Sequence, residues 1–278
     1  MDVILNELSL SGQFSDEDEF IDNLKEIVKI THFFSSYDDL ALLKSYTFWE
    51  SKITSNDTVI TLLQKKGNDV VKKLRTDLFK LSSNPPYWED NRQHCCKSNT
   101  YMFKEQNLCD TGIAESIERD KLILSFKHDD FIDLELNVKK NTSDIIVNNL
   151  SNFKYFIELL FDNSLIDEYR FCKYFFYNTN LNFDLLDDHN RGFNTLSTSI
   201  EKKQFTEQFK TFSNMSWEEI YQSDGFEYKK YNSDLSGFER EDIYKFRISQ
   251  KYRCYGFRKN DIFKVVHFET NHKLSDNG

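Results

Sequence analysis

The stretch that decides the fold of the C-terminal part is Ile243–Glu269, with the sequence IYKFRISQKYRCYGFRKNDIFKVVHFE. Three runs in it are rich in aromatic and β-branched residues, Tyr244–Gln250, Arg253–Arg258 and Ile262–Glu269, and they predict three strands. The four polar residues Arg258–Asp261 predict a hairpin turn between the last two strands. This part of the chain is therefore predicted to form an antiparallel meander.

Two helices are predicted before this meander, one over Ile200–Phe212 and a shorter one that begins at Trp217. The segment 178–200 is rich in Asn and Asp and predicts a boundary between two parts of the chain. We therefore expect an α+β protein with two domains. Residues 1–195 should form a mainly helical domain with a small β element, and residues 196–278 a small α+β domain with an antiparallel sheet.

The pattern of apolar residues predicts the elements of the N-terminal part. Residues 57–64 fit either a helix or a strand, and residues 89–110 are expected to form a long loop. Strands are predicted over 121–127 and 131–138, and helices over 16–34, 38–52, 68–81, 113–120, 144–161 and 165–177.

Composition excludes several classes of protein. The 26 Phe, 14 Tyr and 3 Trp supply enough apolar area for a buried core, and only 2 Pro and 8 Gly argue against disorder. No apolar run approaches the ~18 residues that span a bilayer, and the start of the chain lacks the features of a signal peptide. We therefore expect a cytoplasmic protein without a membrane partner. Its five cysteines match no zinc-binding spacing and are expected to be reduced thiols: Cys95, Cys96, Cys109, Cys172 and Cys254.

The net charge of −10 is unevenly distributed along the chain. Residues 240–278 contain nine Lys/Arg and five Asp/Glu, whereas the remaining residues contain 27 and 41. Within residues 243–264 there are seven basic residues and one acidic residue. A basic segment of this kind indicates a polyanionic partner such as a nucleic acid.

Several short motifs of the C-terminal part occur in a characteristic order. A Trp-x-x-Ile helix start at Trp217 is followed by a strand ending in Arg247, a Tyr-Arg strand at Arg253, a polar hairpin, an apolar strand and a closing His272. Together these residues resemble the RelE/HigB/ParE toxin superfamily over roughly residues 200–278. Residues 1–195 resemble no family.

The resemblance implies a RelE-like domain that cuts mRNA, often on the ribosome, without a metal or another cofactor. It also implies a bacterial toxin–antitoxin or anti-phage (antiviral) defence setting, in which an antitoxin or a defence-system subunit is a protein partner. The N-terminal domain would then sense a trigger or restrain the toxin-like domain. The alternative is a non-catalytic module that binds a nucleic acid or a protein in such a complex, because fold similarity does not determine function.

The resemblance also implies roles for individual residues. Cleavage by the 2′-OH needs a base, an acid and cations that stabilise the charge on phosphorus, and His and Arg suit these tasks. The residues that match catalytic positions are Arg247, Arg253 and His272. The residues that match RNA-binding positions are Lys251, Arg258 and Lys273 for phosphates, and Tyr252 or Tyr255 for stacking on a base.

Other interpretations of the same residues remain open. The two strand arginines could be solvated or paired with nearby acids, Glu239, Glu241 or Asp242, and His267 could be a core or edge residue. Acidic residues around the predicted strands 121–127 and 131–138, including Glu115, could lie on a solvated strand face or indicate a metal-dependent nuclease, for which the required Lys is missing. His94 beside Cys95 could form a base and a nucleophile, although no third orienting group is evident.

Overall fold

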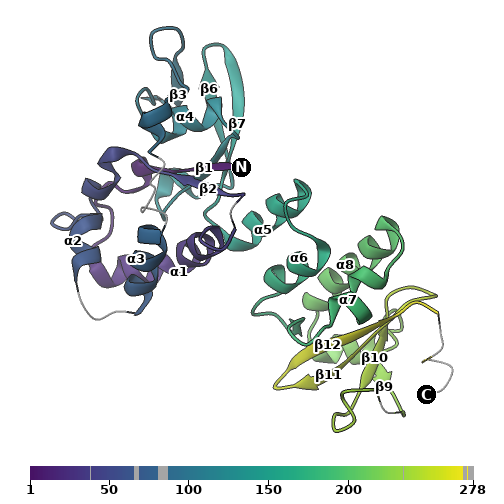
Figure 1. Cartoon of the computed structure of the whole chain (residues 1–278). Coiled ribbons are helices and arrows are strands. Elements are labelled where there is room, and N and C mark those ends of the chain that lie inside the picture. Colours follow the sequence, from purple (N-terminus) through teal and green to yellow (C-terminus); the bar gives the residue numbers. More distant parts are fainter. Residues whose placement is uncertain (38, 66–68, 81–86, 234, 272–273, 275–278) are drawn as a thin grey trace. The chain divides into compact units, whose positions relative to one another are not determined.

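The chain forms two compact units, Met1–Phe156 and Ile157–Gly278. The computed structural model describes all residues except 38, 66–68, 81–86, 234, 272–273 and 275–278, and side chains 78–80 are also outside the description (Figure 1). Each unit has its own mixed sheet, so the predicted α+β class is confirmed. None of the described helices is long and apolar enough to cross a bilayer.

The N-terminal unit is built on a seven-stranded sheet in the order β2-β1-β5-β7-β6-β3-β4. The first four strands in this order are parallel, and the last three are antiparallel to their neighbours. The strands are β1 (Asp2–Leu5), β2 (Ala41–Leu43), β3 (Tyr101–Phe103), β4 (Gln106–Asn107), β5 (Leu122–Leu124), β6 (Glu135–Lys140) and β7 (Ser143–Asn149).

The helices of this unit begin at polar capping residues. Asp16 accepts a hydrogen bond from the backbone of Glu19 and starts the helix predicted over 16–34, and Thr111 starts the helix predicted from 113. The helices are α1 (Glu17–Phe34), α2 (Val59–Gln64), α3 (Asp69–Lys80), α4 (Gly112–Glu118) and α5 (Phe153–Asp162), which crosses the division between the units.

The N-terminal unit contains a much larger sheet than the small β element predicted for it. Residues 143–149, predicted as the start of a helix, form strand β7 and pair with β6 along its whole length. Their run Ile145-Ile146-Val147 is β-branched, which favours a strand over a helix. Residues 41–43 likewise form β2 instead of a helix, and the predicted loop 89–110 contains β3 and β4.

The C-terminal unit contains the predicted meander, which the structure confirms. Its sheet has the order β8-β12-β11-β10-β9, in which only the short strand β8 is parallel to its neighbour. The predicted hairpin turn is also confirmed, since Lys259 pairs with Ile262 and both Asn260 and Asp261 have positive φ angles, as in type I′ two-residue loops. The strands are β8 (Leu181–Asn182), β9 (Lys229–Lys230), β10 (Tyr244–Arg247), β11 (Arg253–Lys259) and β12 (Ile262–Glu269).

One face of this sheet is covered by helices, with α8 packed directly on it (Figure 1). The rings of Phe212 and Phe246 stack 4.7 Å apart, and those of Phe205 and Phe268 stack 4.3 Å apart. Strand β8 joins the same sheet, so residues 157–195 belong to the C-terminal unit and not to a domain ending at residue 195. The helices are α6 (Glu168–Phe175), α7 (Asp188–Arg191), α8 (Ser199–Ser213) and α9 (Trp217–Gln222).

Candidate functional site

The face of the C-terminal sheet opposite α8 has a row of charged residues. Arg247 on β10 lies directly across from Arg253 on β11, and Arg253 lies across from Glu269 on β12. Cross-strand partners project to the same face of a sheet, so the three side chains leave the sheet on one side. The two arginines that the sequence singled out are therefore neighbours, as predicted from their strands.

A second row lies two residues further along the same face. Lys245, Tyr255 and His267 are cross-strand partners on β10, β11 and β12. The fully buried Tyr255 hydroxyl donates a hydrogen bond of 2.7 Å to the carboxylate of Glu269, which joins the two rows. The rings of Tyr255 and His267 lie with their centroids 6.0 Å apart. An imidazole, a phenol and a carboxylate thus lie together beside the arginines.

His267 is held in its neutral form by its surroundings. Burial lowers its pKa, the positive charge of Arg191 lowers it further, and the charge of Glu269 acts in the opposite direction. Its buried Nδ1 atom has no hydrogen-bond partner among the described residues. A neutral imidazole with a free ring nitrogen is able to accept a proton.

Both strand arginines have partners within the protein. Arg247 forms an ion pair with Glu227, not with the acids Glu239, Glu241 or Asp242 considered from the sequence. The Nη1 atom of Arg253 donates to the carbonyl oxygens of Ser249 (2.7 Å) and Tyr252 (3.0 Å) in its own loop. A phosphate would have to compete with these contacts.

The residues predicted to bind RNA are not all accessible. The ring of Tyr255 is fully buried, so in this structure it cannot stack on a base. Tyr252 is almost as buried, and its hydroxyl donates to Glu201 at 2.6 Å. Lys251 is exposed, with its ammonium 5.4 Å from the centre of the Tyr252 ring. His272 and Lys273 lie outside the described residues.

Arg258 lies at a separate hollow of about 310 Å³ on the surface. Its guanidinium stacks 4.1 Å from the centre of the Trp217 ring, donates to the Tyr221 hydroxyl at 3.2 Å and pairs with Asp261. The hollow is lined by Tyr221, Asp242, Tyr244, Arg258, Asn260 and Asp261. Aromatic rings beside an arginine are the side chains that bind unpaired bases.

A covering segment, residues 231–233 and 235–243, lies over the polar face of the sheet. The Tyr231 ring is 5.2 Å from that of Tyr255, and Leu235 and Ile243 belong to the same buried cluster as Tyr255, Phe257 and Val266. From α7, Arg191 donates to the carbonyl of Ser236 at 2.7 Å and so holds the segment in place. The segment therefore helps to bury Tyr255, whereas Arg247, Arg253 and His267 remain partly exposed.

Three features of the two units were not predicted from the sequence. His267 and Glu269 lie two apart on one strand, a spacing that places them on one face, yet His267 was considered only a core or edge residue. Glu115 is not on a solvated surface, because its side chain is fully buried against His94. The cysteines are not all reduced thiols, since Cys96 and Cys109 form a disulfide. The buried His94 faces Glu115 and does not pair with Cys95.

Comparisons of the chain with protein-family models, with curated proteins and with solved structures find no match.

Proposed function

We propose that the C-terminal unit is an RNA-directed effector of the RelE/HigB/ParE type, which cleaves mRNA without a metal. The observation that carries the proposal is the group formed by Tyr255, His267 and Glu269 beside the adjacent Arg247 and Arg253. This group combines a proton acceptor, a carboxylate and two cations on one face of a small sheet. These are the components that RNA cleavage through the 2′-OH requires.

In the proposed reaction, His267 accepts the proton of the attacking 2′-OH because its lowered pKa keeps it neutral near pH 7. The new bond from the 2′-oxygen to phosphorus displaces the 5′-oxygen of the next nucleotide. That leaving oxygen takes up a proton, and the product carries a 2′,3′-cyclic phosphate. Arg253 and Arg247 stabilise the negative charge that develops on the phosphoryl oxygens. His272, which the resemblance implies as a catalytic residue, is the proposed acid.

The burial of Tyr255 and Glu269 implies that the effector is restrained until the covering segment moves. Tyr231, Leu235 and Ile243 pack in one buried cluster with Tyr255, which is itself fully buried. Because this segment is held by apolar contacts and by Arg191, a partner that displaces it would uncover Tyr255 beside the partly exposed Arg247 and Arg253. The trigger would then act on this segment.

A second candidate function is a non-catalytic RNA-binding module. It is favoured by the hollow at Arg258, which is open while Tyr255 and Glu269 are buried, and by the protein contacts that already occupy Arg247 and Arg253. In this case a base would stack beside Tyr221 or Tyr244, and exposed lysines would contact phosphates. Binding would then fall steeply with salt.

The test combines expression in bacteria with RNA binding by the purified full chain. Phe238→Ala removes a ring that packs 6.0 Å from Phe257 and should loosen the covering segment. We expect this variant to stop growth and to produce new mRNA ends by primer extension, more strongly than the wild type. Adding His267→Gln should reduce the cleavage about 10²–10⁴-fold, while RNA binding measured by fluorescence anisotropy is kept.

The matched control is Arg258→Ala, which alters the hollow and leaves the polar face unchanged. If RNA stays intact with the wild type and with Phe238→Ala, and binding is lost with Arg258→Ala, the ribonuclease proposal is wrong and the binding module is supported. Cleavage that persists in Phe238→Ala/His267→Gln would exclude His267 as the base.

A further inference from the structure

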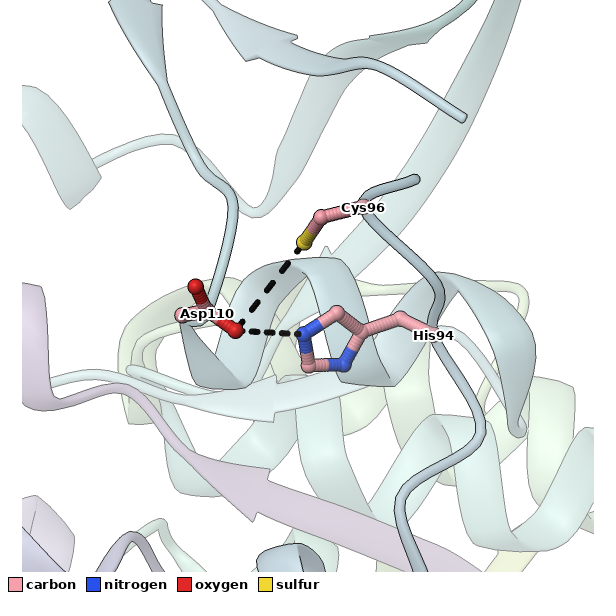
Figure 2. A group of neighbouring side chains, drawn as sticks. All are labelled: His94, Cys96 and Asp110. Carbon is pink, nitrogen blue, oxygen red and sulfur yellow. Dashed lines mark hydrogen bonds and ion pairs between the residues drawn. The ribbon is translucent and has the colours of Figure 1, made fainter. Parts of the chain in front are cut away.

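Three potential metal ligands lie close together at the surface of the N-terminal unit. The proposed RNA site belongs to the other unit. His94 and Cys96 lie in the loop that precedes β3, and Asp110 lies just before α4 (Figure 2). The Oδ1 atom of Asp110 is 3.9 Å from His94 Nε2 and 4.0 Å from Cys96 Sγ. The ligand atoms of these three residues all lie within 4.8 Å of one another.

The imidazole of His94 is oriented so that a lone pair faces this group. Its side chain is fully buried, and Nδ1 lies 2.7 Å from a carboxylate oxygen of Glu115. That carboxylate also accepts hydrogen bonds from the backbone of Gln93 and from Arg119, so it is an acceptor toward Nδ1 as well. The proton of neutral His94 therefore resides on Nδ1, and the lone pair is on Nε2.

The Nε2 atom of His94 is buried and has no hydrogen-bond partner within the described residues. An unpaired buried nitrogen is costly unless it has another role. A histidine that donates one ring N–H to a carboxylate and directs its other nitrogen at further ligands has the arrangement of metal-binding histidines. Here Glu115 is the carboxylate, and Arg119, paired with Asp2 at 2.8 Å, holds it in place.

The types of the three ligand atoms indicate the metal. A nitrogen, a sulfur and a carboxylate oxygen suit zinc, which binds all three in tetrahedral sites. Zinc bonds of about 2.0–2.3 Å imply ligand atoms roughly 3.3–3.8 Å apart. The observed distances of 3.9 and 4.0 Å from Asp110 need only a small contraction.

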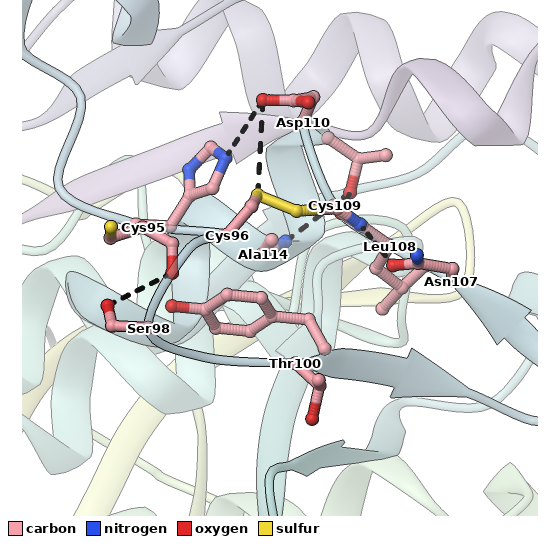
Figure 3. Close-up of a disulfide and its surroundings, with 12 residues drawn as sticks. Cys95, Cys96, Ser98, Thr100, Asn107, Leu108, Cys109, Asp110 and Ala114 are labelled. Atoms are coloured by element: carbon pink, nitrogen blue, oxygen red, sulfur yellow. Dashed lines mark hydrogen bonds and ion pairs between the residues drawn. A yellow bond between two sulfur atoms is a disulfide. The ribbon is translucent and has the colours of Figure 1, made fainter.

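A disulfide competes for one of these ligands. Cys96 is joined to Cys109, whose Cα atom is 5.9 Å away, while the sulfur of Cys95 points away from the bond (Figure 3). A sulfur in a disulfide cannot bind zinc as a thiolate does. Cys109 directly precedes Asp110, so the two are poorly placed to share one tetrahedral site.

We propose that the reduced chain binds one zinc ion through His94 Nε2, Cys96 Sγ and Asp110 Oδ1, and that the Cys96–Cys109 disulfide closes this site. A water molecule takes the fourth position, as in zinc sites with three protein ligands. The role of Cys109 is to form the competing disulfide, not to bind the metal. The site is accessible to the ion, because the Cys96 residue is exposed and 63% of the Asp110 side chain is exposed.

The step that opens the site is a thiol–disulfide exchange. A dithiol reductant transfers two electrons and two protons to the Cys96–Cys109 disulfide, which becomes two thiols, while the reductant becomes a disulfide. Zinc binding then displaces the proton of the Cys96 thiol to solvent. The ion also displaces Arg92, whose guanidinium pairs with Asp110 in the disulfide form.

The experiment uses the full chain, freed of metal with a chelator and then treated with a dithiol. Zn²⁺ is counted by elemental analysis after gel filtration, and Co²⁺ serves as a spectroscopic probe. We expect one ion per reduced chain, with the visible absorption of a tetrahedral cobalt–thiolate site. Oxidation should weaken binding at least about 100-fold, and Asp110→Asn and Cys96→Ser should each weaken it at least about 10-fold.

Two cysteine variants separate the ligand from its neighbours. Cys95→Ser changes an exposed thiol outside the group and should bind the ion like the wild type. Cys109→Ser should also bind it, but binding should no longer respond to oxidant. Circular dichroism of each variant checks that it is folded. The proposal is overturned if the reduced wild type binds no ion, if Cys96→Ser or Asp110→Asn binds as tightly as the wild type, or if Cys109→Ser loses binding.

Discussion

At the scale of single residues, Gly256 allows strands β11 and β12 to pack closely at a bulge. The register of the two strands shifts between Tyr255 and Gly256. A Cβ atom at Gly256 would lie against the carbonyl oxygen of Lys264 and 2.6 Å from the Phe263 ring. We expect Gly256→Ala to lower the free energy of unfolding by about 3 kcal/mol in urea titrations. Gly225→Ala, which meets only Ser223 at 3.5 Å, is the control and should change it by less than about 1 kcal/mol.

Glu7 makes the stability of the N-terminal unit depend on pH. Burial raises its pKa to about 7 from 4.5, against the hydrogen bond of 2.8 Å that it accepts from Gly112. The unfolded chain therefore loses this proton first as the pH rises, and the folded state is destabilised progressively between pH 4.5 and about 7. The stabilising contribution is complete below pH 4.5 and is lost above about pH 7.

We expect Glu7→Gln to remove this loss. The difference in free energy of unfolding, Glu7→Gln minus wild type, should become more positive by about 2 kcal/mol between about pH 4 and about pH 8, after allowance for solvent screening. Urea titrations across this range measure the change. Glu19→Gln is the control with the opposite sign, because hydrogen bonds from Ser15 lower the Glu19 pKa. Parallel pH profiles for wild type and Glu7→Gln would contradict the assignment.

At the scale of elements, the start of α8 is hydrogen-bonded to Tyr252, the residue directly before strand β11. Thr198 and Glu201 form a capping box, and Glu201 also accepts a hydrogen bond of 2.6 Å from the Tyr252 hydroxyl. We expect Thr198→Ala to lower the free energy of unfolding by about 1 kcal/mol, and Glu201→Ala to lower it further, since it removes both contacts. Ile200→Ala, at a side chain that is 71% exposed, should be close to neutral. Equal losses in all three would argue against the capping role.

Capping residues and turn residues in the sequence predicted the helices and the hairpin whose ends they form. The caps at Asp16, Thr111 and Ser216 begin helices that the sequence predicted, and the Asn260-Asp261 turn joins two predicted strands. Strand β2 could not be predicted in this way, because it exists through parallel pairing with β1, almost 40 residues earlier. Strand β7 was mistaken for a helix although Ile145-Ile146-Val147 favoured a strand, because the apolar pattern fits both.

The candidate sites were likewise predictable only in part, where they depend on local sequence. The adjacency of Arg247 and Arg253 followed from a predicted meander of short strands. The approach of Arg191 to His267 and the position of the covering segment depend on tertiary packing that no local pattern encodes. The pair His94 and Glu115 is separated by 21 residues in the sequence and is brought together by a helix and a loop. Such polar pairs are visible in a sequence only as isolated residues.

At the scale of the whole molecule, the two units have separate cores, and each has its own structural feature that affects its stability. The Cys96–Cys109 disulfide, with a sequence separation of 13, lies in the N-terminal unit, and Gly256 lies in the C-terminal unit. Closing a loop of this size is worth about 3 kcal/mol, whatever its physical origin. We therefore expect calorimetry to resolve two unfolding transitions that respond to different changes.

In the presence of a chelator, a dithiol reductant should lower the midpoint of one transition by about 6–12 °C and leave the other unchanged. Gly256→Ala should lower the midpoint of the other transition, and Gly225→Ala should lower neither. Reduction of the Cys109→Ser variant should have no effect, because it has no disulfide to lose. A single transition that shifts with both the reductant and Gly256→Ala would show that the units unfold as one, because two independent cores cannot each respond to a change in the other.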